Sequence, residues 1–216
     1  MNLLDLVFPK RCVNCGRVGK YFCDKCRLLI RPIADNEQIC PMCGRLALDG
    51  ITHPRCRTRY SLDGLTSFFH YSGPVQKAIK ALKYRYVSDL AEEFVSLVPK
   101  FSFPKPCTLI PVALHPSRLR YRGFNQAEEL GKLLRIPMQT DILRRIKATQ
   151  PQAEMKRSER LENMKNVFSI HNSKFTIPDS VLLFDDVFTT GATMRSAANV
   201  LKRAGVKRVW AVTMAR

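Results

Sequence analysis

The sequence predicts an α/β protein in which a parallel sheet is flanked by helices, preceded by a small cysteine-rich domain. Short apolar runs such as Val181–Phe184, bounded by charged residues, are typical of strands buried on both faces. Segments with the i, i+3, i+4, i+7 spacing of amphipathic helices alternate with these runs from Leu62 onward. Paired cysteines are confined to the first 60 residues. We therefore expect one domain at residues 1–60 and a second at residues 61–216.

The first domain contains four pairs of potential metal ligands, and the two members of each pair are separated by two residues. Tetrahedral zinc takes four such ligands, so the spacing predicts two structural zinc sites. The simplest grouping is sequential: Cys12, Cys15, Cys23 and Cys26 on one ion, and Cys40, Cys43, His53 and Cys56 on the other. An interleaved grouping, reduced structural cysteines and a surface role for His53 are the alternatives.

The composition is strongly basic, with 36 Lys and Arg against 18 Asp and Glu and a formal net charge of +18. Such an excess attracts polyanions, which makes nucleic acid or a highly phosphorylated ligand a plausible partner. Because the charge is spread over both domains, a generally basic protein is the alternative. No segment has the ~18 consecutive apolar residues of a membrane span, and the start of the chain lacks the basic region of a signal peptide. We expect a cytoplasmic protein without membrane insertion, in which cysteines bind metal rather than form disulfides.

The second domain alternates strands and helices along its whole length. Right-handed crossovers between such strands give a parallel sheet whose ligand binds at the carboxyl ends of the strands. The expected strands are Leu65–Tyr71, Thr108–Val112, Val181–Phe184 and Val206–Met214, and the expected helices include Val75–Leu82, Ser88–Val98 and Asn125–Leu134.

The stretch Val181–Met194 joins a strand, an acidic pair, a hydroxyl-rich turn and a helix. A helix N-terminus offers unpaired backbone N–H groups and partial positive charge, which suit a phosphate. Asp185 and Asp186 suit ribose hydroxyls or the water shell of a magnesium ion instead. A sugar with a 5-phosphate satisfies both halves of this stretch. An acidic pair followed by an ordinary capped helix is the alternative.

Two basic segments are further candidates for anion binding. Arg118, Arg120 and Arg122 lie at alternate positions, so an extended backbone would place all three on one side, around a shared anion. Lys83 and Arg85 alternate with Tyr84 and Tyr86, a combination that holds phosphates and stacks bases.

The stretch Val181–Met194 closely resembles the phosphoribosyl-pyrophosphate (PRPP) loop of type I phosphoribosyltransferases. By that resemblance Asp185 and Asp186 hold the ribose hydroxyls, and the 5-phosphate is wrapped by Thr189, Thr190, Gly191, Ala192 and Thr193. The loop that holds the pyrophosphate in this fold corresponds to Val112, Ala113 and Leu114.

A polar, basic stretch between Asp141 and Val167 occupies the position of the mobile hood of this fold. Four residues match the family pattern there: Thr149, Gln152, Arg160 and Asn163. Their expected role is either to bind the acceptor or to close the hood. A solvated charged loop is the alternative.

The combination PVxLHxxRxxxRGFNQ, DDVxTTGAT and the N-terminal ligand pairs resembles the ComF family along essentially the whole chain. This resemblance implies a role in natural transformation, in which imported single-stranded DNA is handled on the cytoplasmic side beside a ComFA-like helicase. Ala113 and His53 depart from the family pattern, where a proline and a cysteine are usual.

Three functional hypotheses follow. The first is a ComF-type PRPP-binding protein that binds single-stranded DNA during uptake. The second is an active phosphoribosyltransferase that transfers phosphoribosyl from PRPP, with magnesium, to an unknown acceptor. The sequence does not identify a catalytic residue for this reaction. The third is a non-catalytic zinc-containing adaptor of a DNA-uptake helicase.

Overall fold

A four-stranded parallel sheet forms the centre of the protein, in a computed structural model that describes residues 9–84, 87–101, 103, 107–147, 167–171 and 178–216. The strand order is β1-β6-β5-β2, and all three neighbouring pairs are parallel. The bounds are β1 Gly64–Phe69, β6 Arg208–Ala215, β5 Ser180–Val187 and β2 Thr108–Pro111. The predicted parallel α/β fold is confirmed.

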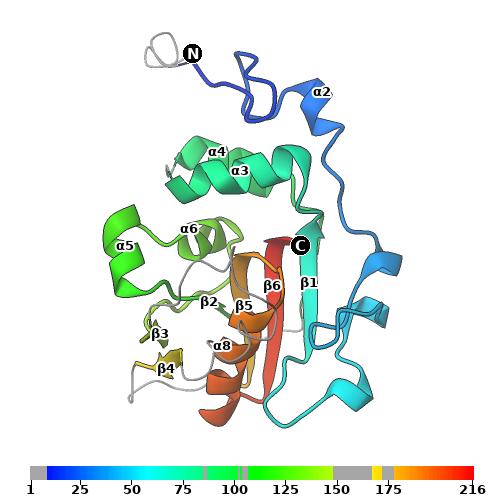
Figure 1. Ribbon diagram of the computed structural model, residues 1–216, viewed down its shortest axis with the longest axis vertical. Helices are drawn as coiled ribbons and strands as arrows, with labels where there is room; N and C mark the ends of the chain where they lie inside the picture. Colours follow the sequence, from blue (N-terminus) through cyan, green and yellow to red (C-terminus); the bar gives the residue numbers. More distant parts are fainter. Residues whose placement is uncertain (1–8, 85–86, 102, 104–106, 148–166, 172–177) are drawn as a thin grey trace.

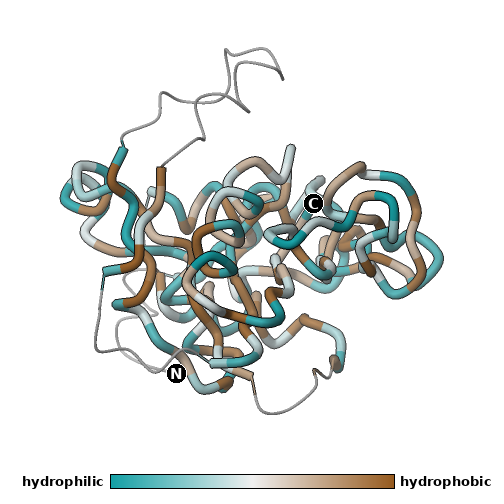
Figure 2. The backbone as a smooth tube through the Cα atoms, turned by 90° about the horizontal axis from the view of Figure 1, so that it is seen from below, coloured by the Kyte–Doolittle hydropathy of each residue, from teal (hydrophilic) through white to brown (hydrophobic). Residues whose placement is uncertain are grey.

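Helices cover both faces of this sheet, as Figure 1 shows. On one face, Leu182 and Val212 pack in a common core with α3 (Gly73–Tyr84), α4 (Ser88–Ser96) and α6 (Gln126–Leu133). On the other face, Leu183 and Ala211 pack with α8 (Ala192–Arg203). Apolar segments cross the middle of the molecule, where these layers meet (Figure 2). Burial on both faces explains why the central strands are continuous apolar runs.

A two-stranded antiparallel ladder lies beside the main sheet. It pairs β3 (Leu143–Arg145) with β4 (Phe168–Ile170), and Leu143 and Phe168 are buried in the α8-side core. Most of the predicted hood lies between these two strands in the sequence. The hood residues Thr149, Gln152, Arg160 and Asn163 lie outside the described residues, as does Arg85.

The arginine-rich segment is a helix, α5 (Pro116–Arg122), so the predicted extended backbone is wrong. Pro116 stands at the first helical position, the His115 side chain accepts a hydrogen bond from the Ser117 amide, and Gly123 ends the helix with φ 78°. These three local signals favour a helix over the extended alternative. Arg118 and Arg122, four positions apart, therefore share a face, whereas Arg120 lies on a different one.

The cysteine-rich segment runs along the edge of the sheet at β1 (Figure 1). Its backbone forms antiparallel bridges with β1 at Pro32–Phe69 and Ile51–Gly64. Short helical turns punctuate this segment: α2 Asp24–Arg27, η1 Asp35–Glu37, η2 Leu48–Gly50 and η3 Pro54–Cys56. The segment therefore covers a strand edge that would otherwise be open to pairing.

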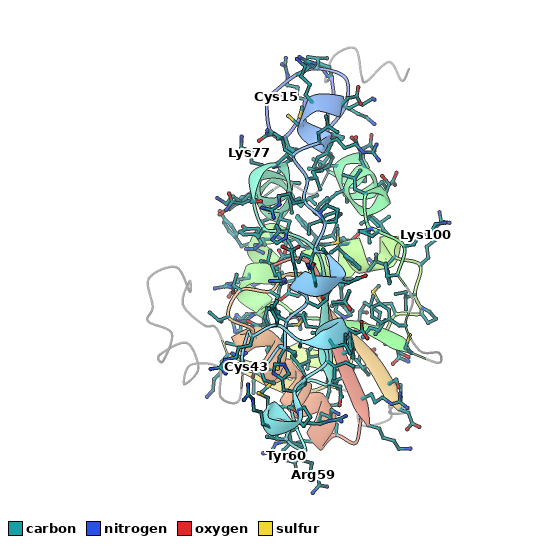
Figure 3. The ribbon with its side chains drawn as sticks, turned by 90° about the vertical axis from the view of Figure 1, so that its right-hand side faces the viewer. Cys15, Cys43, Arg59, Tyr60, Lys77 and Lys100 are labelled. Atoms are coloured by element: carbon teal, nitrogen blue, oxygen red, sulfur yellow. The ribbon has the colours of Figure 1, made fainter. Side chains whose placement is uncertain are left out.

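The two halves of this segment attach to different parts of the second domain. In the first half, the Glu93 carboxylate of α4 accepts hydrogen bonds from the amides of Tyr21 and Phe22 at 3.1 and 2.9 Å, and Lys77 of α3 donates to the Asn14 carbonyl at 2.8 Å. The second half lies beside β1 and α8. Figure 3 shows this separation: Cys15 is near the top of the view and Cys43 is in its lower half. None of the described helices is long and apolar enough to cross a bilayer.

Candidate functional site

Strand β5 carries the acidic pair to the carboxyl end of the sheet. Asp186 is 8% exposed, and its backbone amide donates to the Asp185 carboxylate at 2.8 Å. Burial, together with the neighbouring Asp186 charge, raises the pKa of Asp185 to about 7. Asp185 therefore differs from an ordinary exposed surface carboxyl.

Lys83, at the end of α3, lies against this pair. Its Nζ is 3.1 Å from Asp186 Oδ2. Burial lowers the pKa of Lys83, but the charge and hydrogen bond of Asp186 and the charge of Asp185 together outweigh that effect, so the net pKa is raised above its usual value. We predicted Lys83 as an anion contact beside Arg85, and its described partner is a carboxylate of the candidate sugar site.

Arg145 is a second cation close to the acidic pair. It is only 5% exposed in β3, and its guanidinium carbon lies 5.5 Å from the centre of the Phe168 ring. Burial and the nearby charge of Arg118 lower the pKa of Arg145, whereas Asp185 acts in the opposite direction. The site thus contains two carboxylates with cations from α3 and β3 close to them, and a further cation from α5 near Arg145.

Sequence reasoning missed Arg145, although a signal for it was present. Leu143 and Arg145 alternate along a short strand, so a leucine expected to be buried places the arginine on the same inward face. A buried charge needs a partner or a ligand, which makes such a position a candidate functional residue.

The turn after the acidic pair is held in place by backbone contacts. The Phe188 amide donates to the Ala215 carbonyl at 2.9 Å, and the Thr190 hydroxyl accepts a hydrogen bond from the Ala192 amide at 3.4 Å. Gly191 adopts φ 73° immediately before α8 begins. The turn from Thr189 to Thr193 therefore carries the start of a twelve-residue helix, whose first amides have no partner within the helix. That geometry suits a phosphate.

The predicted pyrophosphate loop begins next to the acidic pair. The Val112 amide donates to the Phe184 carbonyl at 2.8 Å, so Val112, Ala113 and Leu114 start beside the residue that precedes Asp185. Asn125 fixes this loop from α6, because its side-chain amide donates to the Val112 carbonyl at 3.1 Å.

The three predicted arginines occupy two environments. Burial and the nearby charge of Arg122 lower the pKa of Arg118, and Arg122 Nη1 donates to Gln126 Oε1 at 2.9 Å. Arg120 is exposed. The neighbouring Tyr121 is also exposed, with 84% of its surface accessible. The structure therefore brings Arg118 toward Arg145 and leaves Arg120 at the surface.

The potential metal ligands of the first domain form two groups of four in sequential order. Within each group the ligand atoms lie within 4.8 Å of one another; the groups are Cys12, Cys15, Cys23 and Cys26, and Cys40, Cys43, His53 and Cys56. The interleaved alternative does not match this arrangement. Burial raises the pKa of Cys12, but backbone hydrogen bonds from Cys23, Cys15 and Asn14 bring it down to about 6. Four soft ligands at this spacing fit tetrahedral zinc with no open position, so its role in both groups would be structural.

His53 has the geometry of a ligand. Its Nδ1 lies 3.4 Å from Cys43 Sγ, and its Nε2 lies 2.9 Å from the Leu46 carbonyl. A carbonyl accepts only, so Nε2 carries the proton and Nδ1 is available for metal. This arrangement favours a filled second site over a surface role for His53.

Comparison with known proteins places these features in families. Residues 3–58 match the double zinc ribbon domain, and residues 119–216 match the phosphoribosyl transferase domain. Competence protein F of Haemophilus influenzae is 37% identical over 116 residues, which make up 51% of this chain and 51% of that protein. The chain therefore spans about half the length of this relative. Competence protein ComFC of Bacillus subtilis is 28% identical over 85% of this chain and 78% of its own length. DNA utilization protein YhgH of Salmonella typhi is 26% identical over 85% of this chain and 86% of its own length. The chain therefore joins a double zinc ribbon to a phosphoribosyltransferase-type domain and is similar in sequence to proteins named competence protein F and ComFC.

Proposed function

We propose that the carboxyl end of the sheet binds PRPP. One observation carries the proposal: β5 delivers Asp185 and Asp186 directly before the turn at Thr189–Thr193, with Lys83 3.1 Å from Asp186. The carboxylates accept hydrogen bonds from the ribose hydroxyls, and the turn donates backbone N–H groups to the 5-phosphate. The match to the phosphoribosyl transferase domain supports this assignment.

The pyrophosphate of PRPP would lie between the start of the loop at Val112 and the cations Arg118 and Arg145. Both guanidiniums have pKa values lowered by burial, and each is affected by another arginine nearby. Two cations held together in a partly buried site are stabilised by a shared anion. Magnesium bound with PRPP would add further neutralisation of the leaving group.

Calorimetric titration with PRPP and magnesium tests this proposal. We expect binding by the wild-type protein and its loss in the double variant Asp185→Asn, Asp186→Asn. Asp179→Asn is the matched control, because Asp179 is exposed at the opposite end of the same β5 region and pairs only with Lys207 in the described structure. Equal binding by the wild-type protein and the double variant would contradict the proposed site.

We further propose that the protein acts in DNA uptake in the cytoplasm and binds single-stranded DNA there. Its homology to proteins named for competence supports the role, and the net charge of +18 supports an anionic partner. Tyr121 on α5 and Tyr84 at the end of α3 are 84% and 76% exposed beside basic residues. Exposed aromatic rings with neighbouring cations bind single strands by stacking and charge. A ComFA-like helicase stays a predicted partner.

Fluorescence anisotropy with a labelled oligonucleotide at increasing salt tests the DNA proposal. Affinity should fall linearly on a log–log plot, by a slope of roughly −0.7 for each phosphate neutralised. Tyr121→Ala should weaken binding with the slope unchanged, whereas Arg120→Ala should reduce the slope. Binding that is insensitive to salt would contradict the electrostatic contribution.

An active phosphoribosyltransferase is the second candidate function. The cations around the acidic pair favour it, because Lys83, Arg118 and Arg145 would also stabilise a departing pyrophosphate. Release of pyrophosphate from PRPP in the presence of an oligonucleotide or a free base is the measurement. Tight PRPP binding without release would favour a regulatory ligand over a substrate.

A further inference from the structure

Arg195, in the first turn of α8, connects the phosphate turn to the second cysteine cluster. Its Nη2 donates to the Thr190 carbonyl at 2.7 Å, and its Nη1 donates to the Pro41 carbonyl at 2.9 Å. Pro41 lies between the ligands Cys40 and Cys43, and it is separated from Arg195 by 154 positions in the sequence. A single side chain therefore spans from the metal-binding turn to the turn proposed to hold the 5-phosphate.

This contact depends on the shape of the arginine side chain, which passes close to a glycine. The planar guanidinium presents several N–H groups in fixed directions, so it can donate to two carbonyls at once. A Cβ added to Gly191 would lie 2.4 Å from the Phe188 ring and 2.9 Å from Arg195 Nη1. Residue 191 is therefore restricted by the phenylalanine ring and by its own backbone conformation, φ 73°, and the arginine passes close to it.

The metal-binding turn is itself tightly folded around Pro41. The Cys40 amide donates to the Arg45 carbonyl and the Gly44 amide donates to the Cys40 carbonyl, both at 2.9 Å. Met42 packs against the same apolar core as Met194 and Ala197 of α8. A metal ion held by Cys40 and Cys43 would fix this turn, and with it the direction of the Pro41 carbonyl.

We infer that Arg195 is a positioning residue through which metal bound at the second cluster orders the phosphate turn. This inference rests on the proposed PRPP site. Because coupling between two binding sites is reciprocal, PRPP should also slow the loss of zinc from the second cluster. The first cluster has different attachments: it contacts α3 and α4 through Lys77 and Glu93. It therefore provides an internal control.

The test compares Arg195→Met with Arg203→Met. The first substitution removes the two carbonyl contacts at similar side-chain length. The second removes an exposed arginine of the same helix, whose Nε donates to Asn199 at 2.8 Å away from the turn. Both variants should retain the same zinc content as the wild-type protein. Hydrogen exchange of the amides of residues 189–193, measured without any ligand, should accelerate about tenfold in Arg195→Met and stay unchanged in Arg203→Met.

Two further measurements use zinc itself. PRPP should slow zinc transfer to a chromogenic chelator from the second cluster of the wild-type protein, and Arg195→Met should abolish that protection. Cys43→Ala should accelerate exchange in residues 189–193, whereas Cys15→Ala should not. If Arg195→Met matches Arg203→Met in exchange, the inference is wrong. If the wild-type protein does not bind PRPP, the proposed function fails, while the ligand-free exchange still decides whether Arg195 orders the turn.

Discussion

Lys83 and Asp186 form an ion pair of 3.1 Å that links the end of α3 to the end of β5. The lysine side chain is 29% exposed and the aspartate side chain is 12% exposed, so the pair is only partly screened by solvent. Asp185 lies beside it, and the positive charge of Lys83 favours the ionised form of that carboxyl. The pair therefore holds two adjacent carboxylates ready to accept hydrogen bonds.

Replacing Lys83 with Met should weaken PRPP binding. The variant removes a cation from the acidic pair and leaves Asp186 without this partner, at a cost of about 1.5–3 kcal/mol for a hydrogen bond to a charged group. A decrease in affinity of roughly tenfold or more is expected by calorimetry. Lys80→Met, an exposed position on the same helix, is the control. An unchanged affinity in Lys83→Met would show that the ion pair does not contribute to PRPP binding.

The stability of the protein should depend on Asp185 between about pH 4 and pH 7. The pKa of this carboxyl rises from 3.8 to about 7 on folding, mainly through burial. The folded state therefore binds the proton more tightly than the unfolded state, and stability falls as pH rises through that window. Denaturant unfolding at pH 5 and pH 8 is the measurement. Asp185→Asn should lose less stability than the wild-type protein between the two values; equal losses would contradict the raised pKa.

Replacing Gly191 with Ala should destabilise the turn before α8. The new Cβ would lie 2.4 Å from the Phe188 ring, in a backbone conformation with φ 73°. Gly123→Ala is a matched control, because Gly123 has φ 78° but no atom within 4 Å of an added Cβ. We expect the control to lose about 1 kcal/mol from backbone strain and Gly191→Ala to lose more, with weaker PRPP binding as well. Thermal unfolding of the two variants gives the comparison.

The purified protein should contain two zinc ions per chain, one for each group of four ligands. His53→Ala should reduce the content to about one, because three ligands and an open position hold the ion less tightly. His53→Cys restores a thiolate at the same position and should retain both ions. Metal analysis after dialysis against a weak chelator provides the measurement, and full zinc content in His53→Ala would show that His53 is not a ligand.

Features that depend on local spacing were predictable from the sequence. The zinc ligands follow a two-residue gap that brings both members of a pair to one ion, and the apolar run before Asp185 identifies a buried strand without reference to the rest of the chain. The sequential grouping needed the structure, because either grouping satisfies the same gaps.

Features that depend on contacts across the chain were not predictable. Lys83 was grouped with Arg85 by proximity in sequence, and its partner Asp186 lies more than a hundred positions away. Arg145 belongs to a strand of three residues, in which its alternation with Leu143 is a local signal, but the contacts that make it part of the site come from other elements. Helix α5 is a different case. Pro116 and Gly123 are local signals for its two ends, but the alternating arginines were interpreted as an extended segment instead.

The position of β6 has a consequence for how the protein forms during synthesis. This strand, at residues Arg208–Ala215, lies between β1 and β5 in the sheet. Until these residues leave the ribosome, β1 with its cysteine-rich edge and β5 with β2 cannot join into one sheet, because each would pair with β6. The two metal-binding turns are complete much earlier, because their ligands end at Cys56. Early metal binding would therefore cover one edge of β1 while the nascent chain is still most prone to aggregation.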